Sequence, residues 1–199
     1  VVVLEISSYQ LEVLPPELGT PENRPRVESV CAVNVLPDHL ERHGSMEAYA
    51  AAKQRVLELA LAAGGTAVLP AEDEWTSRWR PAGLRRIDAW FERESNVGLA
   101  FGGGEFRLDG SPLGRIEELR LPGAFQRNNT LLALGMARRL GADPARLSAA
   151  IPELRGLPHR LEDLGFGRLV GRLADPALLL DLVEQVGDAD LARSADLDA

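Results

Sequence analysis

The order of short apolar runs and helical segments constrains this chain more than any other feature. Continuous apolar runs occupy residues 1–6, 29–35 and 66–69. Runs of this length without polar alternation are typical of strands buried on both faces of a parallel sheet. Serine-capped helical segments separate them, at residues 7–14 and 45–62. The order strand, helix, strand, helix, strand predicts an α/β fold with a mostly parallel sheet and flanking helices.

The middle of the chain has a different pattern, which predicts a small antiparallel β meander beside that sheet. Gly-Gly-Gly and Asp-Gly separate short apolar segments there, as in consecutive hairpins. We expect the strands of the meander at residues 96–101, 105–108 and 115–121, after a separate short strand at 84–87. We expect further helices at residues 72–80, 124–140 and 144–151.

The chain divides into two parts in this interpretation. Residues 1–162 are expected to form part of one domain. Residues 163–199 are expected to be a divergent tail, with a helix at 177–186 opened by Asp175-Pro176 and a partly disordered acidic end. Because the chain opens on Val1, inside an apolar run, we expect a fragment severed at both ends.

Net charge, cysteine count and the lengths of the apolar runs argue against several classes of protein. Lys plus Arg is 22 and Asp plus Glu is 30, which gives a net charge of −8. Nucleic-acid binding needs a basic face, so this balance argues against it. The single cysteine, Cys31, allows no internal disulfide and suits a reducing compartment. No apolar run approaches the ~20 residues of a membrane helix. We expect a cytoplasmic, monomeric protein without nucleic acid or membrane as partner.

Polar residues follow the first two predicted strands. Glu5 ends the first, and Asn34, Asp38 and His39 stand at or beyond the end of the second. Ligands of open parallel sheets bind at these carboxyl ends. A carboxylate with an imidazole suits a divalent metal such as Mg²⁺. The alternative is a solvated strand end, with Asp38 capping the next turn.

Lys53 interrupts the apolar stripe of the predicted helix 45–62. Tyr49, Val56, Leu57 and Ala60 form that stripe, and the helical period places Lys53 among them. A lysine there either extends its amine to the helix rim or has a lowered pKa beside the metal crevice and reacts as the neutral amine.

Three other segments have simpler interpretations. His159-Arg160 follows Pro158 and presents donors suited to an anion, or forms an ordinary exposed loop. Gly102-Gly103-Gly104 lacks the Lys-Ser/Thr of a phosphate loop and predicts a hairpin turn. Cys31 is expected to be an inert core residue, and His43 an exposed loop residue.

Four ordered motifs resemble those of the cytoplasmic Mur ligases. They are EISSYQLE at 5–12, NVLPDHLERH at 34–43, YAAAK at 49–53 and GLPHRLE at 156–162. Within the family they are most similar to the D-glutamate-adding members. The resemblance covers residues 1–162 and implies the family's central ATPase domain.

The resemblance also implies a reaction in peptidoglycan biosynthesis, with ATP and Mg²⁺ as cofactors. ATP phosphorylates the carboxylate of UDP-N-acetylmuramoyl-L-alanine, and the amine of D-glutamate attacks the acyl phosphate to form an amide. Metal charge offsets the repulsion between the carboxylate and the triphosphate.

Matching positions carry the implied roles. Lys53, carried in the family as a carbamate, and His39 are the implied catalytic residues. The implied metal ligands are Glu5, His39 and Lys53. The substrate side is implied for Ser7 and Gln10, and the nucleotide for Asn129 and Arg160.

Departures from the family pattern keep two alternatives open. The family's phosphate loop is absent, Phe125-Gln126 stand where His-Asn is usual, and no DSKATN segment follows Glu162. A shifted reading frame or a divergent end would explain the last. The chain is therefore a fragment of the D-glutamate-adding ligase, inactive by itself, or a catalytically inactive remnant or binding module that keeps the fold. A folate-chain-extending relative is disfavoured by Ser7-Ser8-Tyr9-Gln10.

Overall fold

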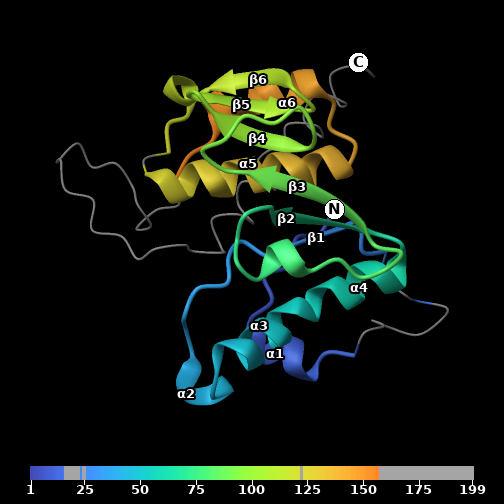
Figure 1. The fold of residues 1–199 in the computed structure, drawn as a ribbon. Coiled ribbons are helices and arrows are strands. Elements are labelled where there is room, and N and C mark those ends of the chain that lie inside the picture. The colour runs from blue at the N-terminus through green and yellow to red at the C-terminus, as the bar shows by residue number, and fades with distance from the viewer. Residues whose placement is uncertain (16–22, 24–25, 122, 157–199) are drawn as a thin grey trace.

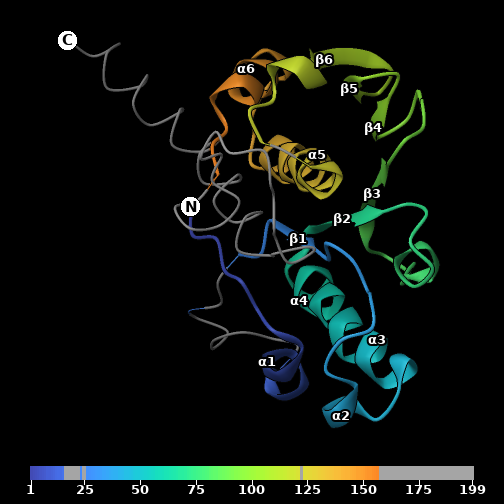
Figure 2. The same cartoon turned by 90° about the vertical axis from the view of Figure 1, so that its left-hand side faces the viewer.

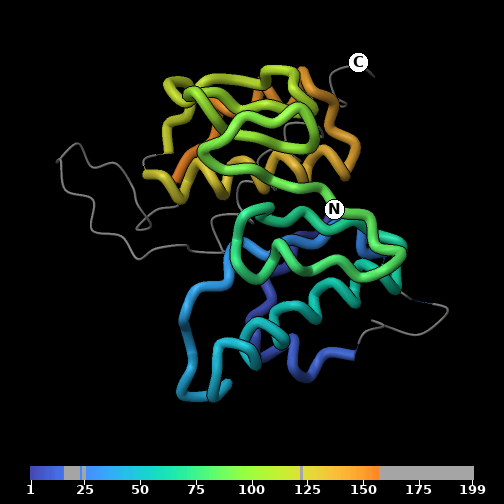
Figure 3. Tube along the Cα trace, in the orientation of Figure 1, coloured from blue at the N-terminus to red at the C-terminus, as the bar shows by residue number. Residues whose placement is uncertain are grey.

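A six-stranded sheet organises the computed structural model, which describes residues 1–15, 23, 26–121 and 123–156. The strands follow one another across the sheet in chain order (Figures 1 and 3). Those from β1 to β4 are parallel, and β5 and β6 continue as antiparallel hairpins. The strands are β1 (Ser29–Cys31), β2 (Thr66–Pro70), β3 (Arg85–Trp90), β4 (Leu99–Gly102), β5 (Glu105–Leu108) and β6 (Ser111–Arg115). The predicted α/β class with an antiparallel meander is confirmed.

Helices cover both faces of the parallel strands (Figure 2). One layer holds α1 (Ser8–Val13), α2 (Leu40–His43), α3 (Met46–Gln54) and α4 (Val56–Ala63), and the other holds α5 (Ala124–Arg139) and α6 (Pro144–Ala150). Side chains of a strand alternate between faces. Accordingly, Ala67 and Leu69 of β2 pack with α3 and α4, whereas Val68 packs with α5. All of β2 is therefore buried, as its continuous apolar run predicts.

Helix α5 lies close to the sheet because of Gly135. A Cβ at this position would stand 2.4 Å from Leu99 Cδ1 and 2.8 Å from Val68 Cγ1. Only a residue without a side chain permits this approach. The helix is followed by α6, which begins as predicted with Asp143 accepting a hydrogen bond from the Arg146 N–H.

The long helix predicted for 45–62 is present in two pieces. Ser45 caps the first by accepting a hydrogen bond from Ala48 N–H at 3.2 Å. The Arg55 N–H bonds the Ala52 carbonyl at 3.3 Å, a three-residue spacing tighter than that of an α-helix. The Arg55 side chain donates to the carbonyls of Glu12 and Leu14. This residue therefore separates α3 from α4 and ties both to α1.

The predicted buried strand at residues 1–6 is wrong. The segment is extended but pairs with no strand of the described residues, and Val1, Val2 and Leu4 are 93%, 82% and 67% exposed. Only Val3 packs against the core under α5. An apolar run becomes a buried strand only where a neighbouring strand pairs with it, and β1 pairs only with β2 among the described strands.

Three other predicted elements differ in extent or type. The strand predicted at 29–35 ends at Cys31, and Val35 N–H instead donates to Asp73. Residues 72–80 form a single 3₁₀ turn, Thr76–Arg78, rather than a helix. The last strand is Ser111–Arg115 and not 115–121, because Asp109 and Gly110 have positive φ and turn the chain directly back.

The remaining predictions fall outside the described residues. They concern Arg160, the helix at 177–186 and the boundary between residues 162 and 163. Among the described residues, no helix combines the length and apolar character that a membrane crossing requires.

Candidate functional site

Lys53, Asn34 and Asp73 meet beyond the carboxyl ends of β1 and β2. The Lys53 ammonium donates to the Asn34 carbonyl at 3.0 Å. The Asp73 carboxylate accepts from Val35 N–H at 3.3 Å and from the N–H groups of Trp75 and Thr76 at 3.0 and 2.8 Å. Asp73 therefore fixes the loop after β2 against the loop after β1. This is the edge at which ligands of parallel sheets bind.

Lys53 is partly buried rather than extended to the helix rim. Its Nζ lies 4.9 Å from the centroid of the Tyr49 ring. Burial lowers the pKa of Lys53 from 10.5, although the charges of Asp38 and Asp73 act to raise it. Burial and Asp38 also raise the pKa of the Tyr49 hydroxyl to about 12, so that this group stays protonated at neutral pH. A dehydrated amine with a lowered pKa has a larger neutral, nucleophilic fraction.

His39 stands just before α2 in a left-handed backbone conformation. Its φ is 53°, which is uncommon for residues other than glycine. The Asp38 carboxylate accepts a hydrogen bond from the backbone N–H of His39 at 2.9 Å, and its other oxygen lies 3.4 Å from His39 Nε2. The ring lies 5.1 Å from that of Tyr9 and remains 44% exposed. The imidazole is therefore accessible from solvent.

His43, which we expected at the surface, is instead buried at the junction of three helices. Its side chain is 1% exposed, with Nδ1 3.0 Å from Glu12 Oε1 and Nε2 3.1 Å from Ser8 Oγ. Its ring stacks on Tyr9 at 5.6 Å and contacts Tyr49 at 5.2 Å. Ser8 and Glu12 are four residues apart on one helix face, which is the spacing that could have indicated a buried partner.

Ser7 and Gln10 bond to each other at the start of α1. Gln10 N–H donates to Ser7 Oγ at 3.3 Å, and Ser7 N–H donates to Gln10 Oε1 at 2.8 Å. Both residues are exposed. This reciprocal capping stabilises the short helix. Glu5 lies exposed in the segment before it, and the described residues bring it into no hydrogen bond or ion pair with His39 or Lys53.

These side chains do not fit a divalent cation as they are placed. In the part of the chain that the structure describes, no three His, Cys, Asp or Glu side chains gather closely enough to hold a metal ion. Mg²⁺ is normally held by oxygen ligands, several of them water. No catalytic step is therefore derived through a metal.

A second group of polar side chains lies on α5, at the opposite face of the sheet. Gln126 is fully buried, and neither atom of its amide has a hydrogen-bond partner among the described residues. Asn129 Nδ2 and Thr130 Oγ1, also buried, are unpartnered as well. Most buried polar groups are hydrogen-bonded, so each exception calls for an explanation. At 0% exposure for Gln126 and Thr130 and 1% for Asn129, these groups are closed to a ligand in this arrangement of α5.

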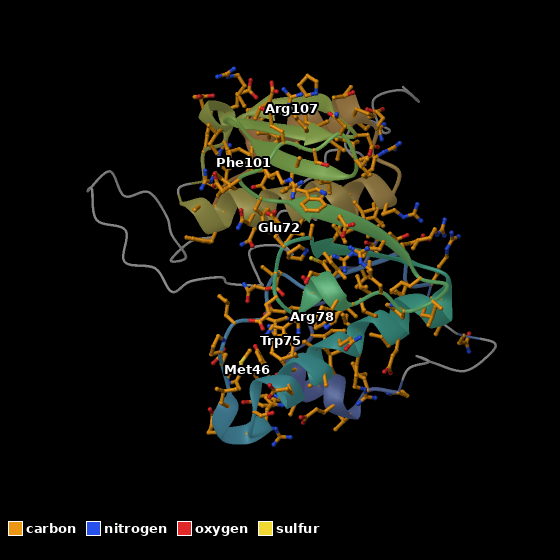
Figure 4. All side chains as sticks on the ribbon, in the orientation of Figure 1. Met46, Glu72, Trp75, Arg78, Phe101 and Arg107 are labelled. Carbon is orange, nitrogen blue, oxygen red and sulfur yellow. The ribbon has the colours of Figure 1, made fainter. Side chains whose placement is uncertain are left out.

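The start of α5 is held to the carboxyl ends of β3 and β4. Arg127 pairs with Glu92 at 2.6 Å and lies over the Phe101 ring at 5.0 Å. Figure 4 shows Phe101 in the half of the molecule with α5, and Met46 and Trp75 in the half with α3. The two groups of site residues therefore belong to the two helical layers of one sheet, the amides to one layer and Lys53 and the two histidines to the other.

Comparisons with known proteins identify relatives of this chain. The family model "Mur ligase middle domain" matches residues 1–137. The UDP-N-acetylmuramoylalanine--D-glutamate ligase of Parasynechococcus marenigrum (strain WH8102) is 35% identical over 170 residues, covering 82% of this chain and 34% of the relative. The ligase of the same name from Caulobacter sp. (strain K31) is 30% identical over 208 residues, covering 98% of this chain and 40% of the relative. The latter alignment continues past residue 162, beyond the four motifs.

A solved structure shows the same fold. It is the UDP-N-acetylmuramate:L-alanyl-gamma-D-glutamyl-meso-diaminopimelate ligase from Neisseria meningitides, with a TM-score of 0.51 and 17% identity. The match covers 64% of this chain and 40% of that one. The chain spans about a third of the length of several curated relatives that it matches. Through the family match over residues 1–137, the chain belongs to the Mur ligase family, as part of its middle domain.

Proposed function

We propose that this chain is part of an ATP-dependent ligase that joins D-glutamate to UDP-N-acetylmuramoyl-L-alanine. The proposal is supported by curated relatives that carry this activity in their names. In the proposed reaction the substrate carboxylate takes the terminal phosphoryl group of ATP and ADP leaves. The amine of D-glutamate then attacks the acyl carbon, an amide forms, and inorganic phosphate leaves. We expect this ligase to act as a monomer in the cytoplasm.

The position and the lowered pKa of Lys53 are the observations that carry the proposal. This residue is the only lysine of the chain, and it lies partly buried at the carboxyl ends of β1 and β2 with a lowered pKa. A neutral amine attacks CO₂ to form an N–C bond and releases one proton, which leaves a carbamate. This converts the side chain into an anion with two oxygen ligands.

We assign the nucleotide to α5. Asn129 is the position that the family resemblance assigns to the nucleotide; its side chain is 1% exposed, so a base reaches it only when the packing around the start of α5 opens. Arg127, anchored on Glu92, holds this end of the helix against the sheet. Ser7 and Gln10 are exposed at the start of α1, and we assign them to the muramoyl-peptide side. Arg160 remains a proposed ATP contact on the motif alone.

The test is a ligase assay on a chimera. Residues 1–156 replace the matching segment of the Parasynechococcus relative, and product is measured by mass spectrometry with UDP-N-acetylmuramoyl-L-alanine, ATP and D-glutamate. We expect amide formation that Lys53→Arg lowers by roughly 10²-fold or more, because the guanidinium cannot form the carbamate and the site loses that anion. The matched control is Arg78→Lys, an exposed change on the loop after β2, which should retain activity. Equal activity of the Lys53→Arg chimera would contradict the proposal.

A second candidate is an inactive remnant or binding module. It is favoured by the described residues, in which no three His, Cys, Asp or Glu side chains gather to hold the metal ion that phosphoryl transfer uses. Titration of the chain with ATP separates the two candidates when combined with the chimera. Binding together with an inactive, folded chimera would favour the module.

A further inference from the structure

Five side chains form one continuous series of contacts, here called the stack, through the layer of α1, α2 and α3. They are His39, Tyr9, His43, Tyr49 and Lys53. Only Tyr9 and His43 are parallel, and the two other ring pairs are tilted at 50° and 48°. Neighbouring ring centroids lie 5.1, 5.6 and 5.2 Å apart in that order, and Lys53 Nζ lies 4.9 Å from the last ring. These are distances of ring stacking and of cation–π contact. His43 therefore stands at the centre of a connection between His39 and Lys53.

His43 is held at both ring nitrogens. A carboxylate can only accept a hydrogen bond, so Nδ1–H donates to Glu12 and Nε2 of the neutral ring accepts from the Ser8 hydroxyl. Glu12 is held in turn by Arg42 at 3.1 Å. Two bonds from one face of α1 fix the rotation of the ring. The imidazole plane is thereby set parallel to Tyr9, with 11° between the two rings.

Ser8, His43 and Glu12 contact one another in the order serine, histidine, carboxylate, which is also the order of catalytic triads with a serine nucleophile. Here Ser8 is only 6% exposed, so its hydroxyl is closed to a substrate. The buried arrangement favours a role in fixing the ring over a role in attacking a substrate.

We propose that His43 is a positioning residue that sets the placement of His39 relative to Lys53. Only the use of these two residues in catalysis rests on the proposed ligase function; their coupling through His43 does not. Without the imidazole, Tyr9 and Tyr49 lose the ring between them. The rings of Tyr9 and Tyr49 are then free to move, and we expect His39, which contacts Tyr9, and Lys53, which contacts Tyr49, to move with them.

The test is NMR of the complete 199-residue chain. Because Lys53 is the only lysine, [¹³Cε]lysine gives one side-chain resonance, and the three histidines give three with [¹³Cε1]histidine. A His39→Gln variant of the chain assigns the His39 signal. Stacking on Tyr49 and Tyr9 displaces the Lys53 and His39 signals by ring currents. We expect His43→Ala to move the chemical shifts of both signals toward those of the free amino acids. Ser8→Ala should move both chemical shifts in the same direction by a smaller amount.

Leu57→Ala is the matched control for a purely structural effect. Leu57 is buried in the same apolar cluster as Tyr49 but lies outside the stack. It should lower stability to urea while leaving both resonances in place. If His43→Ala leaves both signals unchanged, or if Leu57→Ala shifts them equally, the proposal fails. Labelling of Ser8 by a fluorophosphonate in the wild type and not in His43→Ala would also overturn it, because the three residues would then form a nucleophile. If His43→Ala does not fold, Ser8→Ala decides through the same signals.

Discussion

At the scale of single residues, Lys53 shows how burial and charge compete at one amine. Asp38 and Asp73 favour its charged form, yet burial outweighs them and the pKa falls below 10.5. Within the part of the chain that the structure describes, the amine makes one hydrogen bond, to the Asn34 carbonyl oxygen at 3.0 Å. An ammonium held by a single neutral acceptor is only partly compensated for lost water, which explains the direction of the shift.

This shift makes a prediction about stability and pH. Since the folded pKa of Lys53 is lower than the unfolded value, the unfolded chain binds more protons between the two. The free energy of unfolding contributed by Lys53 therefore rises with pH from the lowered pKa up to 10.5. Urea unfolding in CO₂-free buffer checks this: relative to Lys53→Met, the wild type should gain stability as pH increases through this window. A constant difference between the two proteins would contradict it.

Tyr9 and Tyr49 have a related role on either side of His43. Each offers an aromatic face to a histidine, and Tyr49 also contacts Lys53. The sequence stripe correctly placed Tyr49 on the inner face of the helix. It could not place His43, because a four-residue helix offers too few turns for a period to appear and its burial depends on α1, some 30 residues earlier in the chain.

At the scale of elements, local signals predicted what local interactions decide. The Ser7 and Ser45 caps, the Asp143-Pro144 helix start and the Gly103-Gly104 turn depend on neighbours within a few residues, and the structure contains each of them. The strand at residues 1–6 depends on a pairing partner, which no local pattern contains. The loop after β2 resembled a helix, but only Thr76–Arg78 forms a 3₁₀ turn, which Asp73 precedes and supports by accepting from the N–H groups of Trp75 and Thr76.

Local sequence patterns likewise indicated one part of the candidate site and missed another. Lys53 could be predicted because a lysine on an apolar stripe conflicts with its surroundings. The burial of Gln126 could not be predicted, because a polar residue at the start of a helix is usually exposed. Its burial comes from packing of α5 over the sheet, a long-range property.

Gly135 gives a prediction for the packing of α5. Gly135→Ala would place a methyl group 2.4 Å from Leu99 Cδ1, so either the helix or the leucine must move. We expect a loss of roughly 1–3 kcal/mol from overpacking, partly offset by about 1 kcal/mol of helix propensity. Urea denaturation measures the net change. A more stable variant would show that the core under α5 yields easily at this point.

Gln126 gives a second prediction, in which stability and binding change in opposite directions. Gln126→Met keeps the shape of the side chain and removes two unpartnered buried atoms. We expect the nucleotide-free chain to gain roughly 1–3 kcal/mol, the cost of leaving such groups unsatisfied, and to bind ATP more weakly. Thermal unfolding with and without ATP measures both effects. Arg138→Lys on the last turn of the same helix serves as the control.

At the scale of the whole molecule, the sheet connects two candidate subsites that lie on its different faces. Lys53 and the two histidines belong to the layer of α1 to α3, and the unpartnered amides belong to α5. The parallel strands meet both layers at their carboxyl ends, where Arg127 contacts Glu92 and Lys53 contacts Asn34. The sheet therefore lies between Lys53, packed with the cluster under α3 and α4, and the buried amides, packed with the cluster under α5.

The last prediction concerns the 199-residue chain by itself, which we expect to form no amide. It spans about a third of the length of curated relatives named as ligases, and its only lysine lies beyond β1, where it donates to the Asn34 carbonyl. Phosphoryl transfer depends on several donors that surround the phosphates at once, and the described residues supply none of the lysine contacts of a phosphate loop. The purified chain is incubated with UDP-N-acetylmuramoyl-L-alanine, ATP and D-glutamate, and the dipeptide product is sought by mass spectrometry. The chimera described above serves as the positive control. Product from the isolated chain, abolished by Lys53→Arg, would show that a third of the relatives' length is sufficient for the chemistry.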